Sequence, residues 1–203
     1  MNEISKKKYE QLKSLSAGYQ ALLFDVDGTL ADNMHAHKAA YIATAEEYGV
    51  LLDPNLIDET AGWPTVAVAR EIAVRYQVDF DVQVFANRKS AIFIDRYIMD
   101  TKAIDYVRQV LYDSVRSHRI AIVSGGRRST LSKTLAVIEV IGKYETLVCA
   151  GDTLEGKPSP QPFLLAAEQL GVAPEHCLVF EDGDPGVQGA IAAGMDWVRI
   201  DQL

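Results

Sequence analysis

Short apolar runs alternate with longer segments of helical periodicity through the second half of the chain. The apolar runs are typical of buried strands and occupy residues 21–25, 119–123, 146–150, 177–181 and 196–200. Apolar residues at helical spacing occupy residues 129–141, 159–170 and 184–193, each with Ser or Asp at its start and Gly just after its end. Alternating strands and helices predict an α/β fold, with a parallel sheet flanked by helices.

A long stretch after the first strand interrupts this alternation. It contains three segments of helical periodicity, at residues 34–48, 64–76 and 82–99. We therefore expect a discontinuous organisation, with an N-terminal extension at 1–18, an α/β core at 19–33 and 99–203, and a small helical insertion at 34–98. The extension carries three consecutive lysines, and we expect a solvated helix or a disordered arm there.

Two carboxylates stand one residue apart where the first strand ends. The motif Asp-Val-Asp-Gly-Thr begins at Asp25 and places Asp27 two positions later. In open α/β sheets, ligands bind at the carboxyl ends of the strands. Neighbouring carboxylates repel each other and lose water there, a cost that a divalent cation such as Mg²⁺ offsets. A carboxylate beside such an ion can form an aspartyl phosphate, although Asp-Gly is also a common turn pair.

Polar residues also follow other strands or precede a helix. Ser124 and Gly125 follow the run at 119–123, Lys157 precedes a helical segment, and Glu181 and Asp182 end another strand. If the strands are parallel neighbours, these groups meet the first carboxylate pair at one edge of the sheet. Glycine amides and a helix N-terminus bind anions, and the lysine adds positive charge. Together they predict a phosphate-binding site.

These motifs resemble those of the haloacid dehalogenase superfamily. The resemblance rests on the Asp-Val-Asp-Gly-Thr-Leu motif at Asp25, on Ser124, on Lys157-Pro158 and on Glu181-Asp182. Residues 157–163 and 179–195 are similar to the β-phosphoglucomutase-like branch, which includes sugar phosphatases acting on fructose 1-phosphate. The resemblance covers nearly everything from Tyr19 onward. It implies a Rossmann-like core, with the insertion at 34–98 as a cap that closes over a substrate.

The resemblance also implies a role for each carboxylate. Asp25 is the expected nucleophile, and Asp27 is the expected general acid and base, with a pKa raised toward neutrality. The magnesium ligands would be Asp25, the backbone carbonyl of Asp27, and Asp182. Glu181 would orient its neighbours or act through metal-bound water. The alternative for the pair at 181–182 is an acidic helix start, which the helix dipole favours.

The remaining core residues are expected to hold the phosphoryl group. Ser124 and the Gly125 amide would bind its oxygens, and Lys157 would neutralise both the phosphoryl group and Asp25. The alternative for Lys157 is an ordinary surface lysine.

Four residues of the insertion are candidates for substrate contacts. By resemblance, His37 would approach the leaving group or Asp27, Trp63 would belong to a specificity loop, and Lys89 matches a cap lysine of some relatives. Thr65 stands where the mutases carry an arginine that grips a second phosphate, which disfavours a mutase. Surface exposure or ordinary packing is the alternative for His37, Trp63 and Lys89.

The function hypothesis is a Mg²⁺-dependent phosphatase that hydrolyses a small phosphorylated metabolite, with a sugar monophosphate favoured, through an aspartyl phosphate. The first alternative is a phosphomutase of the β-phosphoglucomutase type or an inorganic pyrophosphatase. The second is a non-catalytic, phospho-accepting regulatory module.

Composition bears on the partners and the cellular compartment expected for this activity. A formal net charge of −8 gives no electrostatic support for nucleic-acid binding. No apolar run reaches the length of a membrane span or a signal peptide, so no membrane partner is expected. Cys149 and Cys177 lie in apolar runs and are expected to be buried thiols, as suits a cytoplasmic protein. We expect a monomer or weak dimer.

Overall fold

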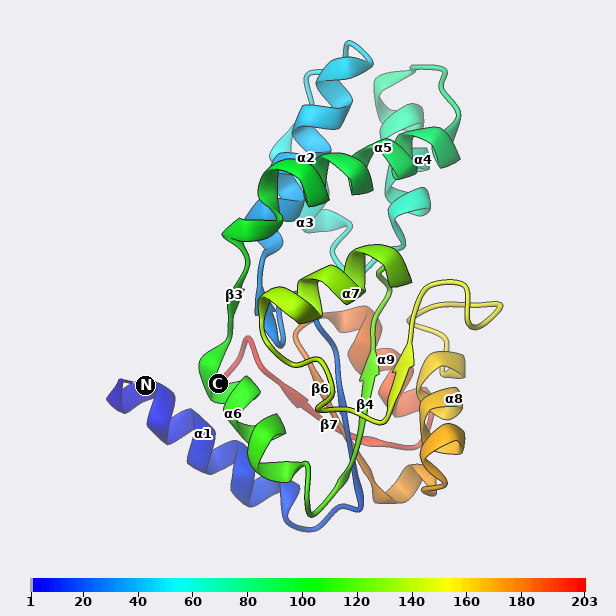
Figure 1. Cartoon of the computed structure of the whole chain (residues 1–203). Helices are drawn as coiled ribbons and strands as arrows, with labels where there is room; N and C mark the ends of the chain where they lie inside the picture. The colour runs from blue at the N-terminus through cyan, green and yellow to red at the C-terminus, as the bar shows by residue number, and fades with distance from the viewer. Residues whose placement is uncertain (1) are drawn as a thin grey trace.

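The computed structural model describes residues 2–203 and contains a five-stranded sheet whose neighbouring strands are all parallel (Figure 1). The strand order is β5-β4-β1-β6-β7. The strands are β1 (Ala21–Phe24), β4 (Arg119–Val123), β5 (Thr146–Val148), β6 (Cys177–Glu181) and β7 (Asp196–Arg199). The predicted parallel α/β sheet is confirmed. Because β1 lies between β4 and β6, the segments that follow these three strands meet at one edge.

Helices cover both faces of this sheet. On one face, α1 (Glu3–Ser16), α6 (Asp105–Ser114) and α7 (Arg128–Val137) pack against Leu22 and Phe24 of β1. On the other face, α8 (Gln161–Leu170) and α9 (Asp184–Ala192) pack against Ala21 and Leu23. Successive side chains of a strand point to opposite faces, so the uniformly apolar β1 is buried on both sides. A short 3₁₀ turn, Pro174–His176, precedes β6.

The N-terminal extension is helical and packs against the core. Tyr9, Leu12 and Ser16 of α1 recur at helical spacing and are buried. The hydroxyl of Tyr9 donates a hydrogen bond to Asp113 of α6 over 2.5 Å. The extension is therefore helical, which was one of the two expectations. It is not solvated on all sides, because its buried stripe packs against the core.

The helical insertion has a hydrophobic core of its own. It contains α2 (Met34–Glu47), α3 (Pro54–Glu59), α4 (Thr65–Tyr76) and α5 (Val82–Ile92), followed by a π-helical turn (Phe93–Tyr97) and a 3₁₀ turn (Ile98–Asp100). Tyr41, Leu56, Ile72 and Phe85 come from the four α-helices and belong to one buried cluster. Figure 1 shows these helices on the side of α7 that faces away from α6. The insertion therefore has its own packing, whereas the proposed domain boundaries remain a prediction.

Two short strands connect the insertion to the core. β2 (Ala31–Asp32) leads into α2, and β3 (Lys102–Ala103) returns to α6. They pair as an antiparallel ribbon, with Ala31 opposite Ala103 and Asp32 opposite Lys102. We refer to residues 31–33 and 101–103 as the hinge ribbon. The sequence analysis did not predict this ribbon, because two-residue strands leave no periodicity to detect.

Several elements end earlier than predicted. The helix expected at 129–141 stops at Val137, because Glu139 adopts a φ of 63° and the amide of Val140 bonds back to the carbonyl of Leu135. The segment expected as one helix at 82–99 is α-helical only to Ile92. β1, β5 and β7 are one or two residues shorter than their apolar runs.

Two features predicted from composition, the cysteines and the membrane spans, can be compared with the structure. Cys149 and Cys177 are both buried free thiols, as expected. None of the helices within residues 2–203 has the length and apolar character that crossing a bilayer requires.

Candidate active site

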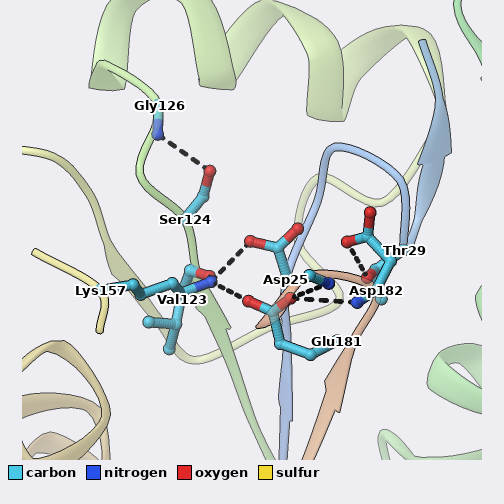
Figure 2. A network of polar contacts seen from close by, with 9 residues as sticks. Asp25, Thr29, Val123, Ser124, Gly126, Lys157, Glu181 and Asp182 are labelled. Carbon is cyan, nitrogen blue, oxygen red and sulfur yellow. Dashed lines mark hydrogen bonds and ion pairs between the residues drawn. The ribbon is translucent and has the colours of Figure 1, made fainter. Parts of the chain in front are cut away.

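The first part of the site is the edge of the sheet where β1, β4 and β6 end. Asp25 follows β1, Ser124 follows β4, and Asp182 follows β6, so parallel pairing brings them together. Figure 2 shows these side chains pointing into a common space at the ends of the strands. One pocket is lined by Asp25, Asp27, His37, Trp63, Thr65, Lys89, Ser124, Gly125, Lys157, Glu181 and Asp182. All candidate residues of the sequence analysis therefore line the same pocket.

Lys157 connects the ends of three strands, β1, β4 and β6. Its buried amino group donates to Asp25 Oδ1 over 2.6 Å, to Glu181 Oε1 over 2.5 Å and to the Val123 carbonyl over 2.9 Å (Figure 2). Although burial opposes its charge, the two carboxylates raise the pKa of Lys157, which keeps it cationic. The alternative of a surface lysine is therefore wrong: the side chain is 6% exposed.

Asp25 is a buried carboxylate in a strongly charged environment. Burial is the main reason that its pKa is raised well above the ordinary value. The cation of Lys157 opposes this rise, while the negative charges of Glu181 and Asp182 add to it. A cation near these three carboxylates would therefore favour the ionised form of Asp25, which a nucleophile requires.

Three carboxylates lie close enough together that they could hold a metal ion. One oxygen each from Asp25, Glu181 and Asp182 lies within 4.8 Å of the others. Burial and the charge of Glu181 raise the pKa of Asp182 to about 6. Hard oxygen donors at this density fit a divalent cation such as Mg²⁺. The carboxylate of Asp27 does not belong to this cluster.

Local backbone geometry keeps this cluster compact. Gly28 has a φ of 94°, and a Cβ on it would lie 2.0 Å from Asp182 Oδ2, so a side chain here would be strained and would displace the Asp182 carboxylate. Thr29 donates a hydrogen bond to Asp182 Oδ1 over 3.1 Å. Glu181 Oε2 accepts the amides of Asp182 and Gly183, each over 3.0 Å. Since the other Glu181 oxygen accepts from Lys157, both are engaged, which favours an orienting role for this side chain.

Asp27 points toward the helical insertion. Its Oδ1 accepts a hydrogen bond from Asn33 Nδ2 over 2.6 Å and lies 3.3 Å from His37 Nε2. Burial alone raises the pKa of Asp27, but attraction to His37 and hydrogen bonds from His37 and Asn33 outweigh it and lower the pKa to about 2. The expectation of a pKa raised toward neutrality is therefore wrong for this arrangement, because it took no account of hydrogen bonds from His37 and Asn33 to the carboxylate.

Lys89, His37 and Asp27 form a chain of polar contacts. The amino group of Lys89 lies 2.7 Å from His37 Nδ1, and the imidazole stacks on Phe93 with ring centroids 4.0 Å apart. Burial, followed by the nearby cation of Lys89, lowers the pKa of His37. A neutral His37 that accepts from Lys89 at Nδ1 carries its proton on Nε2, which faces Asp27.

Lys89 itself is buried against aromatic rings. Its amino group lies 4.4 Å from the ring centroid of Tyr41, and burial lowers its pKa to about 7. Both exposed-surface alternatives, for Lys89 and for His37, are therefore wrong. Thr65 begins α4 and Trp63 precedes it, so these two lie where the insertion meets the core pocket.

The phosphate-binding candidates Ser124 and Gly125 line the same pocket. Ser124 is buried, and its Oγ accepts the Gly126 amide over 3.0 Å. A Cβ on Gly125 would lie 3.7 Å from the carbonyl oxygen of Gly62, so the insertion comes close to this loop. The neighbouring Arg127 donates a hydrogen bond to Asn87 of α5, which links core and insertion beside the pocket.

The family described as haloacid dehalogenase-like hydrolase matches residues 22–200. The chain belongs to this family. This hydrolase is 32% identical over 187 residues to the fructose-1-phosphate phosphatase YqaB of Escherichia coli (strain K12), which covers 90% of this chain and 96% of that one. The resemblance inferred from the motifs is confirmed.

Other relatives agree with this assignment. The hydrolase is 31% identical over 186 residues to a phosphorylated carbohydrates phosphatase of Thermotoga maritima, covering 87% of this chain and 82% of that one. The crystal structure of a β-phosphoglucomutase from Clostridium difficile has a TM-score of 0.78 at 20% identity, over 89% of this chain and 84% of that one, which shows a shared fold. The predicted enzyme class, a phosphoric monoester hydrolase, is confirmed.

Sequence reasoning missed two residues of this hydrolase's pocket region. Asn33 is fully buried and holds Asp27, but a lone asparagine before a helix reads as an ordinary N-cap. Tyr41 lines the pocket one helical turn after His37. Its spacing of four residues was a usable signal, because such residues share a helix face.

Proposed function

We propose that this protein is a Mg²⁺-dependent phosphatase that hydrolyses a small phosphorylated metabolite through an aspartyl phosphate on Asp25. A sugar monophosphate is the favoured substrate, as the names of the two curated relatives suggest. The observation that carries the proposal is the placement of Asp25 within 2.6 Å of Lys157 and inside the cluster with Glu181 and Asp182.

The chain's own residues divide the work of phosphoryl transfer. Asp25 attacks phosphorus in line, and the P–O bond to the alcohol breaks as the Asp25–phosphorus bond forms. Lys157, the Ser124 hydroxyl and the Gly125 amide bind the phosphoryl oxygens as negative charge shifts among them. Asp25 and Asp182, with the backbone carbonyl of residue 27, would hold Mg²⁺, which supplies positive charge beside the phosphoryl group.

Asp27 moves the proton in both halves of the reaction. It donates a proton to the leaving alkoxide and then accepts one from the water that cleaves the aspartyl phosphate. In the structure its carboxylate is held ionised by His37 and Asn33. A phosphate dianion entering the pocket adds negative charge next to Asp27 and so favours its protonated form. His37 and Lys89 would set the position of Asp27 against the leaving group.

A substrate panel tests this proposal. The purified protein is assayed for phosphate release from sugar monophosphates, other phosphorylated metabolites and an aryl phosphate, with Mg²⁺ and with excess chelator. We expect turnover that requires the metal and that Asp25→Asn abolishes. Full activity in the chelated protein or in Asp25→Asn would contradict the scheme.

The same assay separates the alternatives. Isomerisation of a sugar phosphate in the presence of a bisphosphate identifies a mutase, and preference for pyrophosphate identifies a pyrophosphatase. A phosphoaspartate that persists without turnover identifies a regulatory module. The proposed activity differs from all three by multiple turnover of a monoester to free phosphate.

A further inference from the structure

Buried oxygens without a partner draw attention to the hinge ribbon. Within residues 2–203, the buried side-chain atoms that lack a hydrogen-bond partner are Asn33 Oδ1, Thr101 Oγ1 and Thr130 Oγ1. Two of these three lie on the hinge ribbon, Asn33 directly after β2 and Thr101 directly before β3. Buried polar groups normally have a hydrogen-bond partner, so two unpaired side-chain oxygens on a single ribbon call for an explanation.

Extending the register of the ribbon by one residue sets Asn33 and Thr101 opposite each other. Ala31 faces Ala103 and Asp32 faces Lys102, so the next step of the same antiparallel register puts Asn33 opposite Thr101. Side chains directly opposite in such a pair have Cβ atoms about 4.5–5.5 Å apart. Figure 1 shows the two connections running side by side between core and insertion.

Burial supports the same placement. Asp32 and Lys102 are exposed, whereas Asn33 is fully buried and Thr101 is 5% exposed. Alternate residues of a strand share a face, so the ribbon has an outer face with Asp32 and Lys102 and an inner face with Asn33 and Thr101. The inner face is the one from which Asn33 reaches Asp27.

The two unpaired oxygens are chemically complementary. The Asn33 amide uses Nδ2 to donate to Asp27 Oδ1 over 2.6 Å, and its Oδ1 is an acceptor without a donor. The Thr101 hydroxyl can donate one hydrogen bond. We propose that Thr101 is a positioning residue whose hydroxyl donates to Asn33 Oδ1 when the hinge turns, which holds the Asn33 amide group toward Asp27.

This hydrogen bond would control an amide orientation that matters for proton transfer. If the Asn33 amide turned over, its oxygen would face the carboxylate of Asp27 and repel it. A hydrogen-bond donor at Asn33 Oδ1 prevents this. The Thr101 hydroxyl would therefore fix the orientation of the Asn33 amide that donates to Asp27. The inference rests on the proposed role of Asp27 in protonating the leaving alkoxide.

The dependence of kcat/KM on the leaving group of the ester measures this positioning role of Thr101. An alkyl alkoxide leaves only with a proton, whereas an aryl oxide leaves readily without one. The ratio kcat/KM reports the first irreversible step for both esters, so later hydrolysis of the aspartyl phosphate does not enter. A misplaced Asp27 therefore lowers kcat/KM for a sugar phosphate selectively, and a merely structural defect lowers it for both.

The test compares Thr101→Val, which removes the hydroxyl at constant shape, with Thr101→Ser, which keeps it. We expect Thr101→Val to lower kcat/KM for a sugar monophosphate about tenfold and to leave that for an aryl phosphate within about twofold, since oriented general acids contribute factors of this order or more. Thr101→Ser is expected to match the wild type. Thermal unfolding shows whether Thr101→Val folds normally. If it does not, Thr101→Ala removes the same hydroxyl and must reproduce the selective loss in kcat/KM.

Three results would overturn the proposal. They are equal losses for both esters, no loss for either, or a Thr101→Ser variant that behaves like Thr101→Val. A wild type that hydrolyses neither ester would overturn the proposed function, and the positioning role with it. An active wild type with unchanged selectivity in the variants would overturn the positioning role alone.

Discussion

The amino group of Lys157 lies 2.6 Å from the carboxylate of Asp25, although 132 residues separate the two in the sequence. The same amino group contacts Glu181, so one cation joins the residues that end β1 and β6. A buried ion pair of this kind is weak evidence of net stabilisation, because desolvation of both charges offsets their attraction. Its geometry instead holds a carboxylate and a cation where a phosphoryl group would bind.

Lys157→Met is expected to destabilise the fold, because the carboxylates of Asp25 and Glu181 would then face each other without a cation. Removing one partner of a buried ion pair costs about 3–5 kcal/mol. Chemical denaturation measures this loss in the free energy of unfolding. Lys133→Met, on the exposed side of α7, is the matched control and should change it by less than about 0.5 kcal/mol. An unfolding free energy for Lys157→Met equal to that of the wild type would show that the pair is not held as described.

Gly28→Ala is expected to weaken metal activation. The added Cβ would lie 2.0 Å from Asp182 Oδ2 and must displace this carboxylate, a proposed metal ligand, from its position beside Asp25. Disturbing the support of metal ligands commonly costs about 10–100-fold in affinity or activity. The measurement is the Mg²⁺ concentration that gives half-maximal phosphatase activity, which should rise at least about tenfold on that basis.

Gly49→Ala is the control for backbone strain. Gly49 has a φ of 73°, and a Cβ there would meet nothing within 4 Å. Both variants therefore carry the strain of a left-handed alanine, but only Gly28→Ala displaces a carboxylate. Similar metal dependence in the two variants would argue against Asp182 as a ligand.

Lys89 is expected to make stability depend on pH. Burial lowers its pKa from 10.5 to about 7 in the folded protein. Between these values the unfolded chain binds more protons, so the free energy of unfolding of the wild type rises with pH. A shift of one pKa unit corresponds to about 1.36 kcal/mol, so the full effect is at most about 5 kcal/mol.

Lys89→Met removes this titration. Denaturation of both proteins at about pH 7.5 and about pH 9.5 should show the wild type gaining stability relative to the variant at the higher pH. Lys133→Met provides the comparison with an exposed lysine, whose stability difference from the wild type should not change with pH. A constant difference between wild type and Lys89→Met would mean that Lys89 is not buried as the structure shows.

The sequence was sufficient to predict the sheet and most of the core site. The apolar runs that form β1, β4 and β6 lead directly to polar residues, and parallel pairing then requires Asp25, Ser124 and Asp182 to share one edge. Local patterns carry this information because strand direction and strand order convert it directly into proximity.

Other features depended on contacts that no local pattern encodes. The π-helical turn at Phe93 places a ring against His37, and neither residue signals the other in sequence. The lowered pKa of Asp27 follows from Asn33 and His37, whose side-chain directions are set by the hinge and α2. The ribbon of β2 and β3 is likewise too short to have a period.

The central claim is that Asp25 carries the phosphoryl group between two chemical steps, and Asp27→Asn offers the most direct measurement. An aryl phosphate needs no acid to transfer its phosphoryl group to Asp25, but hydrolysis of the aspartyl phosphate needs Asp27 as base. After mixing with Mg²⁺ and the ester, acid quenching, proteolysis and mass spectrometry of Asp27→Asn should find one phosphoryl group on the peptide that contains Asp25. The double variant Asp25→Asn/Asp27→Asn should carry none. An unmodified Asp25 peptide from Asp27→Asn, under conditions in which the wild type hydrolyses the same ester, would contradict the account.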